Sequence, residues 1–325
     1  MIESITAYRQ TFLDHLSRLE FPETPRGLYH PIEYILEIGG KRIRPVLVLL
    51  SADLYATDLK KALPAATAVE IFHNFTLIHD DIMDAAPLRR GRETVHEKWD
   101  ANTAILSGDA MMIEAYRQLE SYPPEVFKPM MVFFSKTALE VCEGQQYDMD
   151  FETLDQVGID QYLKMIEYKT AVLLGCALRM GALIGGATPS DQEAIYVFGI
   201  QLGMAFQLQD DYLDVFGDPK TFGKQVGGDI IENKKTYLYL RALEIATEEE
   251  TRELRDLYSI KTRDPQAKVE RVTQIFRSSG SAEATRERIR AYTEDAFKQL
   301  ESLNLPEDRK ATLKEFGEWL LNRNF

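Results

Sequence analysis

Two copies of the pattern Asp-Asp-x-x-Asp constrain the fold of this chain more than any other feature. The first spans Asp80 to Asp84 and the second spans Asp210 to Asp214. In a helix, residues four apart lie one above the other, so the outer aspartates of each copy share a face. Two such faces opposite each other would place six carboxylates around one cavity, where mutual repulsion raises their pKa values. The pattern therefore favours two helices that face a shared cation site.

Hard divalent cations neutralise a cluster of this kind. Mg²⁺ prefers oxygen ligands and is commonly held by carboxylates together with substrate phosphates. The candidate metal ligands are the aspartates of the two motifs: Asp80, Asp81, Asp84, Asp210, Asp211 and Asp214. The sequence thus predicts a diphosphate site that is clamped by magnesium.

Helical periodicity runs through almost the whole chain of 325 residues. Regular alternation bounded by hairpin turns, the mark of strands, is scarce. The breaks are short runs rich in Gly and Pro, and none has the length or composition of a flexible linker. We therefore expect an all-α fold in which residues 1–325 form a single domain. Its architecture would be one large helical bundle with two Asp-rich helices facing a central cavity.

Composition argues against nucleic-acid binding and against a membrane span, and it favours a cytoplasmic location. The formal net charge of −14 and the pI near 5.0 argue against nonspecific nucleic-acid binding, which needs a basic surface. No apolar stretch reaches the ~18 residues of a transmembrane helix, and the first residues do not resemble a signal peptide. Cys142 and Cys176 lie in apolar helical patterns, which suits packing residues in a reducing compartment. We expect a cytoplasmic protein with no transmembrane segment and no nucleic-acid partner.

The helix below the first motif offers a candidate pocket wall. A proline suits the first turn of a helix, so we expect this helix over residues 64–84. Phe72 and Thr76 lie two turns and one turn below Asp80 on roughly the same face, and Phe75 flanks them. A diphosphate held by the aspartates would extend an apolar tail along these side chains. The alternative is that both phenylalanines are ordinary core residues, which is the commoner role of an aromatic residue at helical spacing.

Two basic clusters accompany the motifs. Arg89 and Arg90 lie directly after the first motif, in a loop marked by Pro87 and Gly91. The planar fork of arginine suits phosphate oxygens. Residues 41–44 form the densest basic cluster and follow two glycines at the start of a helix, which is a plausible anion site. The alternative for each cluster is a solvated surface.

Polar residues also interrupt the apolar helices. Lys169 and Thr170 lie inside an apolar helix expected over residues 161–183. A lysine there is unfavourable unless it is paired or faces a polar cavity. Gln207 precedes Asp210 by about one turn, so its amide should face the same cavity.

A third group of cations surrounds a glycine-rich segment. Lys224, Lys234 and Lys235 flank the sequence Gly-Gly-Asp at residues 227–229. As members of an active site, these lysines would neutralise phosphate charge when a loop closes. As ordinary residues, they would lie on a solvated loop.

In this order, the motifs resemble those of the trans-isoprenyl diphosphate synthases, the polyprenyl synthetase family. The matching segments are Gly-Gly-Lys-Arg-Ile-Arg-Pro, His-Asp-Asp-Ile-Met-Asp with Leu-Arg-Arg-Gly, Lys-Thr, Phe-Gln-Leu-Gln-Asp-Asp-Tyr-Leu-Asp, and Gly-Lys with Asn-Lys-Lys-Thr. One Asp-Asp-x-x-Asp pattern occurs by chance, but five motifs in the family's order are specific. The resemblance implies head-to-tail condensation of isopentenyl diphosphate (IPP) with an allylic diphosphate (dimethylallyl, geranyl or farnesyl). It also implies an all-α homodimer with three Mg²⁺ ions per active site.

The resemblance also implies a role for each motif residue. The main Mg²⁺ ligands would be Asp80, Asp84 and Asp210, and the supporting ligands would be Asp81, Asp211 and Asp214. The cations that grip the allylic diphosphate would be Arg89, Lys169, Lys224 and Lys234. The residues that hold IPP would be Lys41, Arg44, His73 and Arg90. The dipoles beside the developing carbocation would come from Thr170 and Gln207.

In this family, a bulky aromatic residue five positions before the first motif shortens the product. Here that residue is Phe75, whereas the next, Thr76, is small. This combination is typical of a geranylgeranyl (C20) product, and two adjacent aromatics would indicate farnesyl (C15). Phe72, one turn deeper, argues against a very long product. We expect a C20 synthase, with a C15 synthase as the alternative ahead of a longer-chain polyprenyl synthase.

Two other classes of protein compete with this interpretation. A class I terpene cyclase normally carries an Asn/Ser/Glu metal motif in second place and does not need the IPP set. A regulatory subunit would typically lose one Asp motif, and both are intact here. The sequence departs from the family at Ala85-Ala86, where relatives often carry Asp or Asn. It also departs at the weakly basic end, residues 322–325, so a role of that end in closing over IPP has no support.

Overall fold

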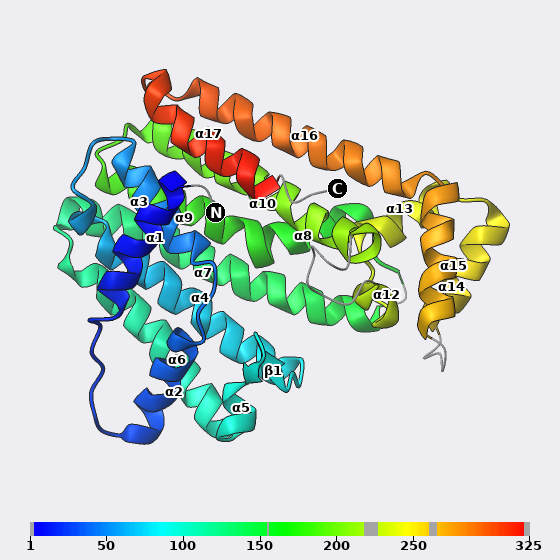
Figure 1. Cartoon of the computed structure of the whole chain (residues 1–325), viewed down its shortest axis with the longest axis horizontal. Coiled ribbons are helices and arrows are strands. Elements are labelled where there is room, and N and C mark those ends of the chain that lie inside the picture. Colours follow the sequence, from blue (N-terminus) through cyan, green and yellow to red (C-terminus); the bar gives the residue numbers. More distant parts are fainter. Residues whose placement is uncertain (1–2, 155, 218–226, 260–264, 322–325) are drawn as a thin grey trace. The chain divides into compact units, whose positions relative to one another are not determined.

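The computed structural model of the chain describes residues 3–154, 156–217, 227–259 and 265–321. Helices dominate these residues (Figure 1). The helices before the first hairpin are α1 (Glu3–Leu16), α2 (Arg26–Glu37), α3 (Ile43–Asp53), η1 (Leu59–Lys61) and α4 (Leu63–Met83). Those that follow it are α5 (Val95–Lys98), α6 (Ala101–Arg117), η2 (Gln118–Ser121), α7 (Pro124–Thr153), α8 (Ile159–Ile166), η3 (Glu167–Ala171), α9 (Val172–Ile184) and α10 (Pro189–Phe216). The last are α12 (Gly228–Ile231), α13 (Tyr237–Ile245), α14 (Glu248–Ser259), α15 (Pro265–Ser278), α16 (Ser281–Ser302) and α17 (Glu307–Leu321). The predicted all-α fold is confirmed.

The chain divides into two compact units. Unit 1 comprises Met1–Phe134 and Ala177–Gln192, and unit 2 comprises Ser135–Cys176 and Glu193–Phe325. The division falls within α7, α9 and α10, each of which contributes residues to both units. The single domain expected from the sequence stays a prediction.

Helix α4 is the central helix of unit 1. It packs against α3 and α6 (Figure 1). Nearly every residue from Ala65 to Phe75 is buried, whichever side of the helix it occupies. A helix that is apolar on all sides is one enclosed by other helices, so the sequence of α4 accounts for its position. The helix ends at Met83, within a residue of the predicted end, and the first Asp motif therefore occupies its last turn.

A short hairpin replaces the loop expected after this motif. Strands β1 (Leu88–Arg89) and β2 (Arg92–Glu93) pair in antiparallel fashion. Arg90 and Gly91 both have positive φ angles, 54° and 76°. Two such residues are what the type I′ turn of a two-residue hairpin requires. Strands of two residues are too short to show alternation, which is why the sequence pattern did not reveal them.

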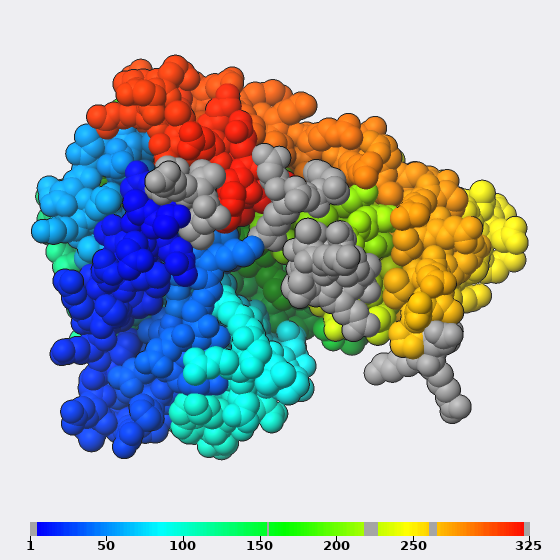
Figure 2. Space-filling model, viewed as in Figure 1, coloured from blue at the N-terminus to red at the C-terminus, as the bar shows by residue number. Residues whose placement is uncertain are grey.

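Helix α10 carries the second Asp motif in unit 2. Many of its apolar side chains, among them Phe198 and Leu202, are fully buried. Helix α16 packs against α13, α15 and α17. The atoms of α14, α15 and α16 form a continuous surface, coloured yellow to orange (Figure 2). The second motif lies in the last turns of α10, which ends at Phe216.

The helix expected over residues 161–183 is interrupted in the structure. Between α8 and α9, residues Glu167–Ala171 form a π-helical turn that contains Lys169 and Thr170. Such turns are rare and occur frequently at functional sites. Gly144 of α7 lies against this turn so closely that an added Cβ would collide with the Lys169 backbone. The extra residue of a π turn leaves the apolar pattern unchanged, so periodicity alone predicted one continuous helix.

Two smaller expectations are also tested. Cys176 is buried, as expected of a packing residue, whereas Cys142 is exposed, which corrects that expectation. Within the described ranges, the helices are too short or too polar to span a membrane. The cytoplasmic location stays a prediction.

Candidate active site

The aspartates of the first motif occupy two different environments. Asp80 is half-buried, and Asp84, one turn further, is exposed at the end of α4. Asp81 is buried, and both of its carboxylate oxygens accept hydrogen bonds from Arg89 Nε, at 2.9 Å and 2.8 Å. Arg89 Nη2 lies 2.7 Å from the same carboxylate. The outer aspartates are therefore more exposed than the middle one, which fixes an arginine on β1.

Both motifs lie at the negative ends of helices. Helix α4 ends at Met83 and α10 ends at Phe216, and neither has a basic residue in its last turn. The helix dipole disfavours a carboxylate there by on the order of 0.3–1 kcal/mol. A bound cation would relieve this repulsion, and the oxygen donors suit Mg²⁺. Within the part of the chain that the structure describes, no three His, Cys, Asp or Glu side chains converge as a preformed ion site.

One histidine in unit 1 contacts an arginine and feels the positive charge of three others. Arg44 Nη1 lies 3.1 Å from Nε2 of His73. Burial, reinforced by the positive charges of Arg44, Arg90, Arg89 and Arg42, lowers the pKa of His73 well below its usual value. Burial also lowers the pKa of Arg44 to about 10. His73 is therefore neutral near pH 7, and the surrounding cluster of positive charge fits a multiply charged anion such as a diphosphate.

Arg90 connects the hairpin after the first motif with the basic segment at residues 39–45. Its guanidinium donates a hydrogen bond to the carbonyl of Gly39. An added Cβ on Gly40 would lie 2.5 Å from Arg90 Nη1, so only glycine allows this approach. Lys41 follows in the same segment and is exposed. The structure therefore brings the residues expected to hold IPP to one place in unit 1: Lys41, Arg44, His73 and Arg90.

A buried ion pair supports this cluster. Arg42, which precedes α3 with a φ of 53°, donates to the carboxylate of Glu70 and to the carbonyl of Leu36. Glu70 lies on α4 and also accepts a hydrogen bond from Asn74 Nδ2 at 3.1 Å. Arg42 and Glu70 are almost fully enclosed. The pair therefore attaches the basic segment at residues 39–45 to the central helix.

We expect Glu70→Gln to lower the free energy of unfolding by about 3–5 kcal/mol, because it leaves the Arg42 guanidinium buried without its carboxylate. Urea unfolding followed by circular dichroism measures this loss. Glu283→Gln on α16 is the matched control, since the Glu283 carboxylate is 52% exposed in its pairs with Arg286 and Arg290. The control should lose less than about 1 kcal/mol. Equally small losses in both variants would contradict a structural role for the buried pair.

The residues expected to limit product length belong to an aromatic cluster. The ring centroid of Phe72 lies 5.5 Å from that of Phe75 and 5.5 Å from that of Phe134 on α7. Phe75 also packs edge-on against His79, with 4.8 Å between centroids. The hydroxyl of Thr76 donates to the carbonyl of His73 at 2.8 Å. Phe72 and Phe75 are both buried, so they serve the core, and their role as a pocket wall stays a prediction.

In unit 2, a chain of hydrogen bonds connects the π turn with the second motif. The Thr170 hydroxyl lies 3.4 Å from Gln207 Oε1, and Gln207 Nε2 donates to Asp211 Oδ1 at 3.3 Å. The hydroxyl of Tyr162 on α8 donates to the other oxygen of Asp211. Burial and the negative charge of Asp229 raise the pKa of Asp211 to about 8. As in the first motif, the middle aspartate is buried and holds neighbouring protein groups.

Lys169 projects from the π turn toward a carboxylate that the sequence analysis missed. Its Nζ lies 2.5 Å from Asp148 Oδ2 on α7. Both side chains are partly exposed. The pairing explains how an apolar helix accommodates a lysine.

The segment after the second motif is attached to Asp214. The backbone N–H of Asp229 donates to Asp214 Oδ2 at 3.0 Å, and that of Gly227 donates to the Asp214 carbonyl at 2.6 Å. Asp214 thus fixes the start of α12. Lys224 and the terminal residues 322–325 lie outside the described residues, so their expected roles, or lack of one, stay predictions.

The two lysines after α12 have different environments. Lys234 Nζ lies 3.1 Å from a Glu232 carboxylate oxygen, and its side chain is largely exposed. Lys235 Nζ instead donates to the main-chain carbonyls of Phe151, at 2.8 Å, and Leu154. Lys235 therefore anchors the segment, whereas the more exposed Lys234 pairs with the carboxylates of Glu232 and Asp229.

Comparison with known proteins decides the family. Residues 25–276 match the family model described as Polyprenyl synthetase. The chain belongs to the polyprenyl synthetase family. It is 40% identical over 304 residues to the geranylgeranyl pyrophosphate synthase of Geoglobus acetivorans, an alignment that covers 93% of this chain and 92% of that protein. The family and the prenyl-transferring enzyme class predicted from the motifs are confirmed.

Solved structures of geranylgeranyl pyrophosphate synthases share the fold of this chain. A crystal structure of a geranylgeranyl pyrophosphate synthase is 52% identical, with a TM-score of 0.95 and full coverage of both chains. The geranylgeranyl pyrophosphate synthase of Corynebacterium glutamicum complexed with isoprenyl diphosphate and magnesium is 27% identical, with a TM-score of 0.81 and coverage of 99% and 97%. The predicted isoprenoid synthase type of fold is therefore confirmed.

Several residues of this polyprenyl synthetase support the motif residues without belonging to a recognised motif. They hold Arg42, an aromatic cluster, a lysine and an aspartate in place: Glu70, Phe134, Asp148 and Tyr162. Glu70 and Tyr162 lie in apolar helical stretches. An isolated polar residue there is the only signal that sequence reading could have used, because the partner comes from a distant segment.

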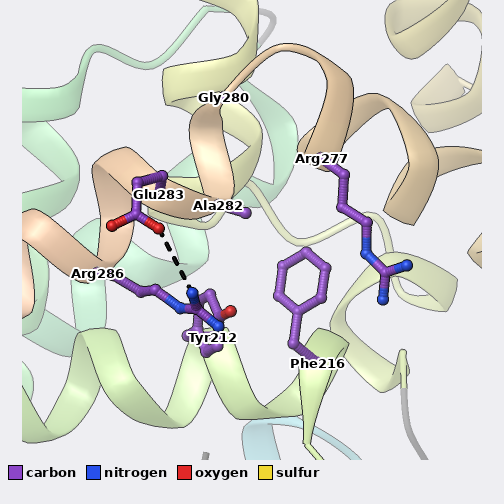
Figure 3. Close-up of a pocket in the computed structure, with 7 residues that line it drawn as sticks. All are labelled: Tyr212, Phe216, Arg277, Gly280, Ala282, Glu283 and Arg286. Atoms are coloured by element: carbon purple, nitrogen blue, oxygen red, sulfur yellow. Dashed lines mark hydrogen bonds and ion pairs between the residues drawn. The ribbon is translucent and has the colours of Figure 1, made fainter.

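A pocket of about 370 Å³ in unit 2 of this polyprenyl synthetase is separate from these residues (Figure 3). It is lined by Tyr212, Phe216, Arg277, Gly280, Ala282, Glu283 and Arg286. Arg286 stacks over the Tyr212 ring at 5.2 Å and pairs with Glu283 at 3.4 Å. Residues two apart on a helix point in nearly opposite directions, so Tyr212 lies on the other side of α10 from Asp210 and Asp214. This pocket is therefore on the back of the motif helix.

Proposed function

We propose that the enzyme condenses IPP with allylic diphosphates and releases all-trans geranylgeranyl (C20) diphosphate. The observation that carries this proposal is the density of opposite charge at the end of α4. There Asp80 and Asp84 flank Asp81, whose carboxylate binds Arg89, and His73, two turns earlier on the same helix, contacts Arg44. The similarity to geranylgeranyl pyrophosphate synthases supports the C20 product.

The carboxylates that would hold Mg²⁺ are Asp80, Asp84 and Asp210. When bound, Mg²⁺ would neutralise charge on the leaving diphosphate. The buried positions of Asp81 and Asp211, each bonded to protein groups, favour supporting roles for them. A count of three ions per site stays a prediction, as does the arrangement of both motifs around one cavity.

The cations of the chain bind the allylic diphosphate and stabilise it as a leaving group. Arg89 is held in orientation by Asp81, so little rearrangement is needed when it contacts phosphate oxygens. Lys169 and Lys234, both partly exposed, are the further cations that we propose for this diphosphate. As the carbon–oxygen bond of the allylic substrate breaks, negative charge grows on the diphosphate. Preorganised cations stabilise that charge most strongly where water is excluded.

The IPP set orients the second substrate. Arg44 and Arg90 supply charge for its diphosphate, Lys41 adds to it, and neutral His73 supplies a hydrogen bond. Holding the double bond of IPP beside the allylic carbon makes the condensation effectively intramolecular. The double bond then attacks the allylic carbocation, and a new carbon–carbon bond forms.

Two oxygen dipoles face the carbocation in this proposal. Because Gln207 Nε2 donates to Asp211, its Oε1 is directed to the side where Thr170 lies. These oxygens oppose the positive charge. The new cation loses a proton from the carbon that lies between it and the carbon bearing the diphosphate, and the double bond of the new allylic diphosphate forms there. The released diphosphate is the best acceptor, since the strongly lowered pKa of His73 makes that residue a weak base.

The experiment that tests the function is direct. The protein is incubated with Mg²⁺, labelled IPP and each allylic starter in turn, and the products are sized by mass spectrometry. We expect turnover that needs both substrates and ends at C20. Product from farnesyl diphosphate without IPP would indicate a terpene cyclase instead. Activity only after mixing with a second protein would indicate a regulatory subunit.

We also propose that the enzyme is a homodimer in which α6 of unit 1 faces a second copy. Leu106 and Ile113, seven residues apart on one side of α6, are 59% and 60% exposed. Val132 on α7, also in unit 1, is 67% exposed. Exposed apolar patches of this kind commonly mark an interface between proteins.

We expect Leu106→Asp combined with Ile113→Asp to convert the dimer to a monomer, because buried carboxylates would oppose association. Light scattering after size-exclusion chromatography gives the mass of each species. Ile245→Asp on α13 is the control, since Ile245 is an exposed apolar residue outside this patch. A monomeric parent protein, or a dimer that survives the double substitution, would rule out this interface.

A further inference from the structure

Lys268 is a buried lysine that has no role in the proposed reaction. It lies on α15, and its side chain is 3% exposed. Its Nζ donates a hydrogen bond to the side-chain oxygen of Asn233 and lies 5.3 Å from the centre of the Tyr258 ring. These partners are an amide and an aromatic face. Burying an ammonium group is unfavourable, so a lysine buried among these partners indicates a structural or functional role for its charge.

Asn233 occupies the turn that directs Lys234. Its φ is 61°, the left-handed conformation that ends a helix, here α12. The turn is closed by a hydrogen bond from the Lys234 N–H to the Asp229 carbonyl at 2.9 Å. Asparagine tolerates this conformation better than most residues, but it is not as free to adopt it as glycine. The bond from Lys268 therefore acts on the residue whose backbone sets the direction of Lys234.

Helix α15 contacts the same segment at a second point. Gly227, which precedes α12, lies against Val269 so closely that an added Cβ would come within 2.6 Å of a methyl carbon. Gly227 also donates to the carbonyl of Asp214 in the second motif. Helix α15 thus holds one end of α12 through Val269 and the other end through Lys268. Lys234 is the first side chain beyond that second attachment.

We propose that Lys268 is a positioning residue that acts through Asn233 to aim Lys234 at the allylic diphosphate. The proposal rests on the proposed function, in which Lys234 contacts that diphosphate. Lys268 does not meet the substrate itself, because it is enclosed behind the turn. Its removal should therefore affect the substrate bound by Lys234 and leave the IPP set in unit 1 unchanged.

The test is Lys268→Met, which keeps the length of the side chain and removes the donor. We expect the KM for dimethylallyl diphosphate to rise about tenfold, the typical effect of losing one charge-assisted contact, with the KM for IPP unchanged. The midpoint of thermal unfolding should stay the same or rise, since a buried charge is removed. Amide hydrogen exchange at Lys234 and Thr236 should accelerate. A merely structural lysine would instead lower the unfolding midpoint and affect both substrates.

A second substitution tests whether Lys268 acts on Lys234 through Asn233. Adding Asn233→Gly to Lys268→Met should return the KM for dimethylallyl diphosphate to within about twofold of the parent value, because glycine adopts the left-handed conformation without an anchor. Lys310→Met is the matched control. Lys310 is 7% exposed on α17, and its Nζ donates to the Glu301 carbonyl and the Glu307 carboxylate, each at 3.0 Å. This variant should leave both KM values unchanged.

The outcomes separate this inference from the proposed function. If the parent protein does not condense the two substrates, the proposed function fails first. If the parent turns over and Lys268→Met changes both KM values alike, or neither, then the positioning role alone is overturned. If Asn233→Gly does not restore the KM for dimethylallyl diphosphate, the proposal that Lys268 acts through Asn233 is overturned.

Discussion

Asp80→Ala and Asp210→Ala are each expected to reduce turnover by on the order of a hundred- to a thousandfold, the usual effect of removing one group that stabilises transition-state charge. Stability should be retained. Asp80 lies in the last turn of α4, at the negative end of the helix, so removing its carboxylate relieves repulsion and raises the free energy of unfolding by up to about 1 kcal/mol. Steady-state rates at several Mg²⁺ concentrations, with urea unfolding of the same samples, measure both effects.

The control is Asp256→Ala on α14, an exposed carboxylate outside the motifs. It should change neither rate nor stability measurably. Asp81→Asn offers a sharper comparison, because Asp81 holds Arg89. We expect that variant to weaken binding of the allylic diphosphate more than it alters the Mg²⁺ requirement. Near-normal activity at low Mg²⁺ in Asp80→Ala or Asp210→Ala would refute their assignment as ligands.

Phe75→Ala should have the second large effect, on product length. Phe75 lies one turn before His79, packs against it and Phe72, and is buried. Replacing the ring by a methyl group opens space below the first motif, so the growing chain can extend past C20. Mass spectrometry of the products gives the new length. The same cavity should lower the free energy of unfolding by about 3–5 kcal/mol, so measurements belong well below the unfolding temperature.

Phe198→Ala separates the two consequences of Phe75→Ala. Phe198 is fully buried in unit 2, so the same atoms are removed from the core without touching α4. This variant should lose comparable stability and keep the C20 product. Phe75→Leu, which removes less volume, should lengthen the product less. An unchanged product from Phe75→Ala would remove Phe75 from the floor of the pocket.

The positions of the motif residues on their helices follow from local sequence spacing. Spacing of four on a helix placed Asp80 and Asp84 together, and the apolar pattern below them gave the bounds of α4 to within a residue. Spacing could not show that Asp81 turns to Arg89, because that contact depends on the hairpin. Sequence spacing also could not distinguish the environments of Lys234 and Lys235, because their partners are known only from the folded structure.

The supporting residues escaped prediction for one physical reason. Glu70, Asp148 and Lys268 act through partners that are 28, 21 and 35 residues away in the chain. A buried polar residue on an apolar helix has no meaning until folding supplies its partner. The π turn at Glu167–Ala171 was hidden for a related reason, since close packing of Gly144 against it leaves no trace in periodicity.

The sequence by itself therefore determined the helical fold, the two aspartate motifs and the family, because helical spacing and local composition encode them. Tertiary structure alone decided which members of each motif turn inward and bond to other parts of the protein. Asp81 and Asp211 are buried against Arg89 and Tyr162, whereas Asp80 and Asp84 are not. That division depends on desolvation and on hydrogen bonds between distant segments, which exist only once the chain has folded.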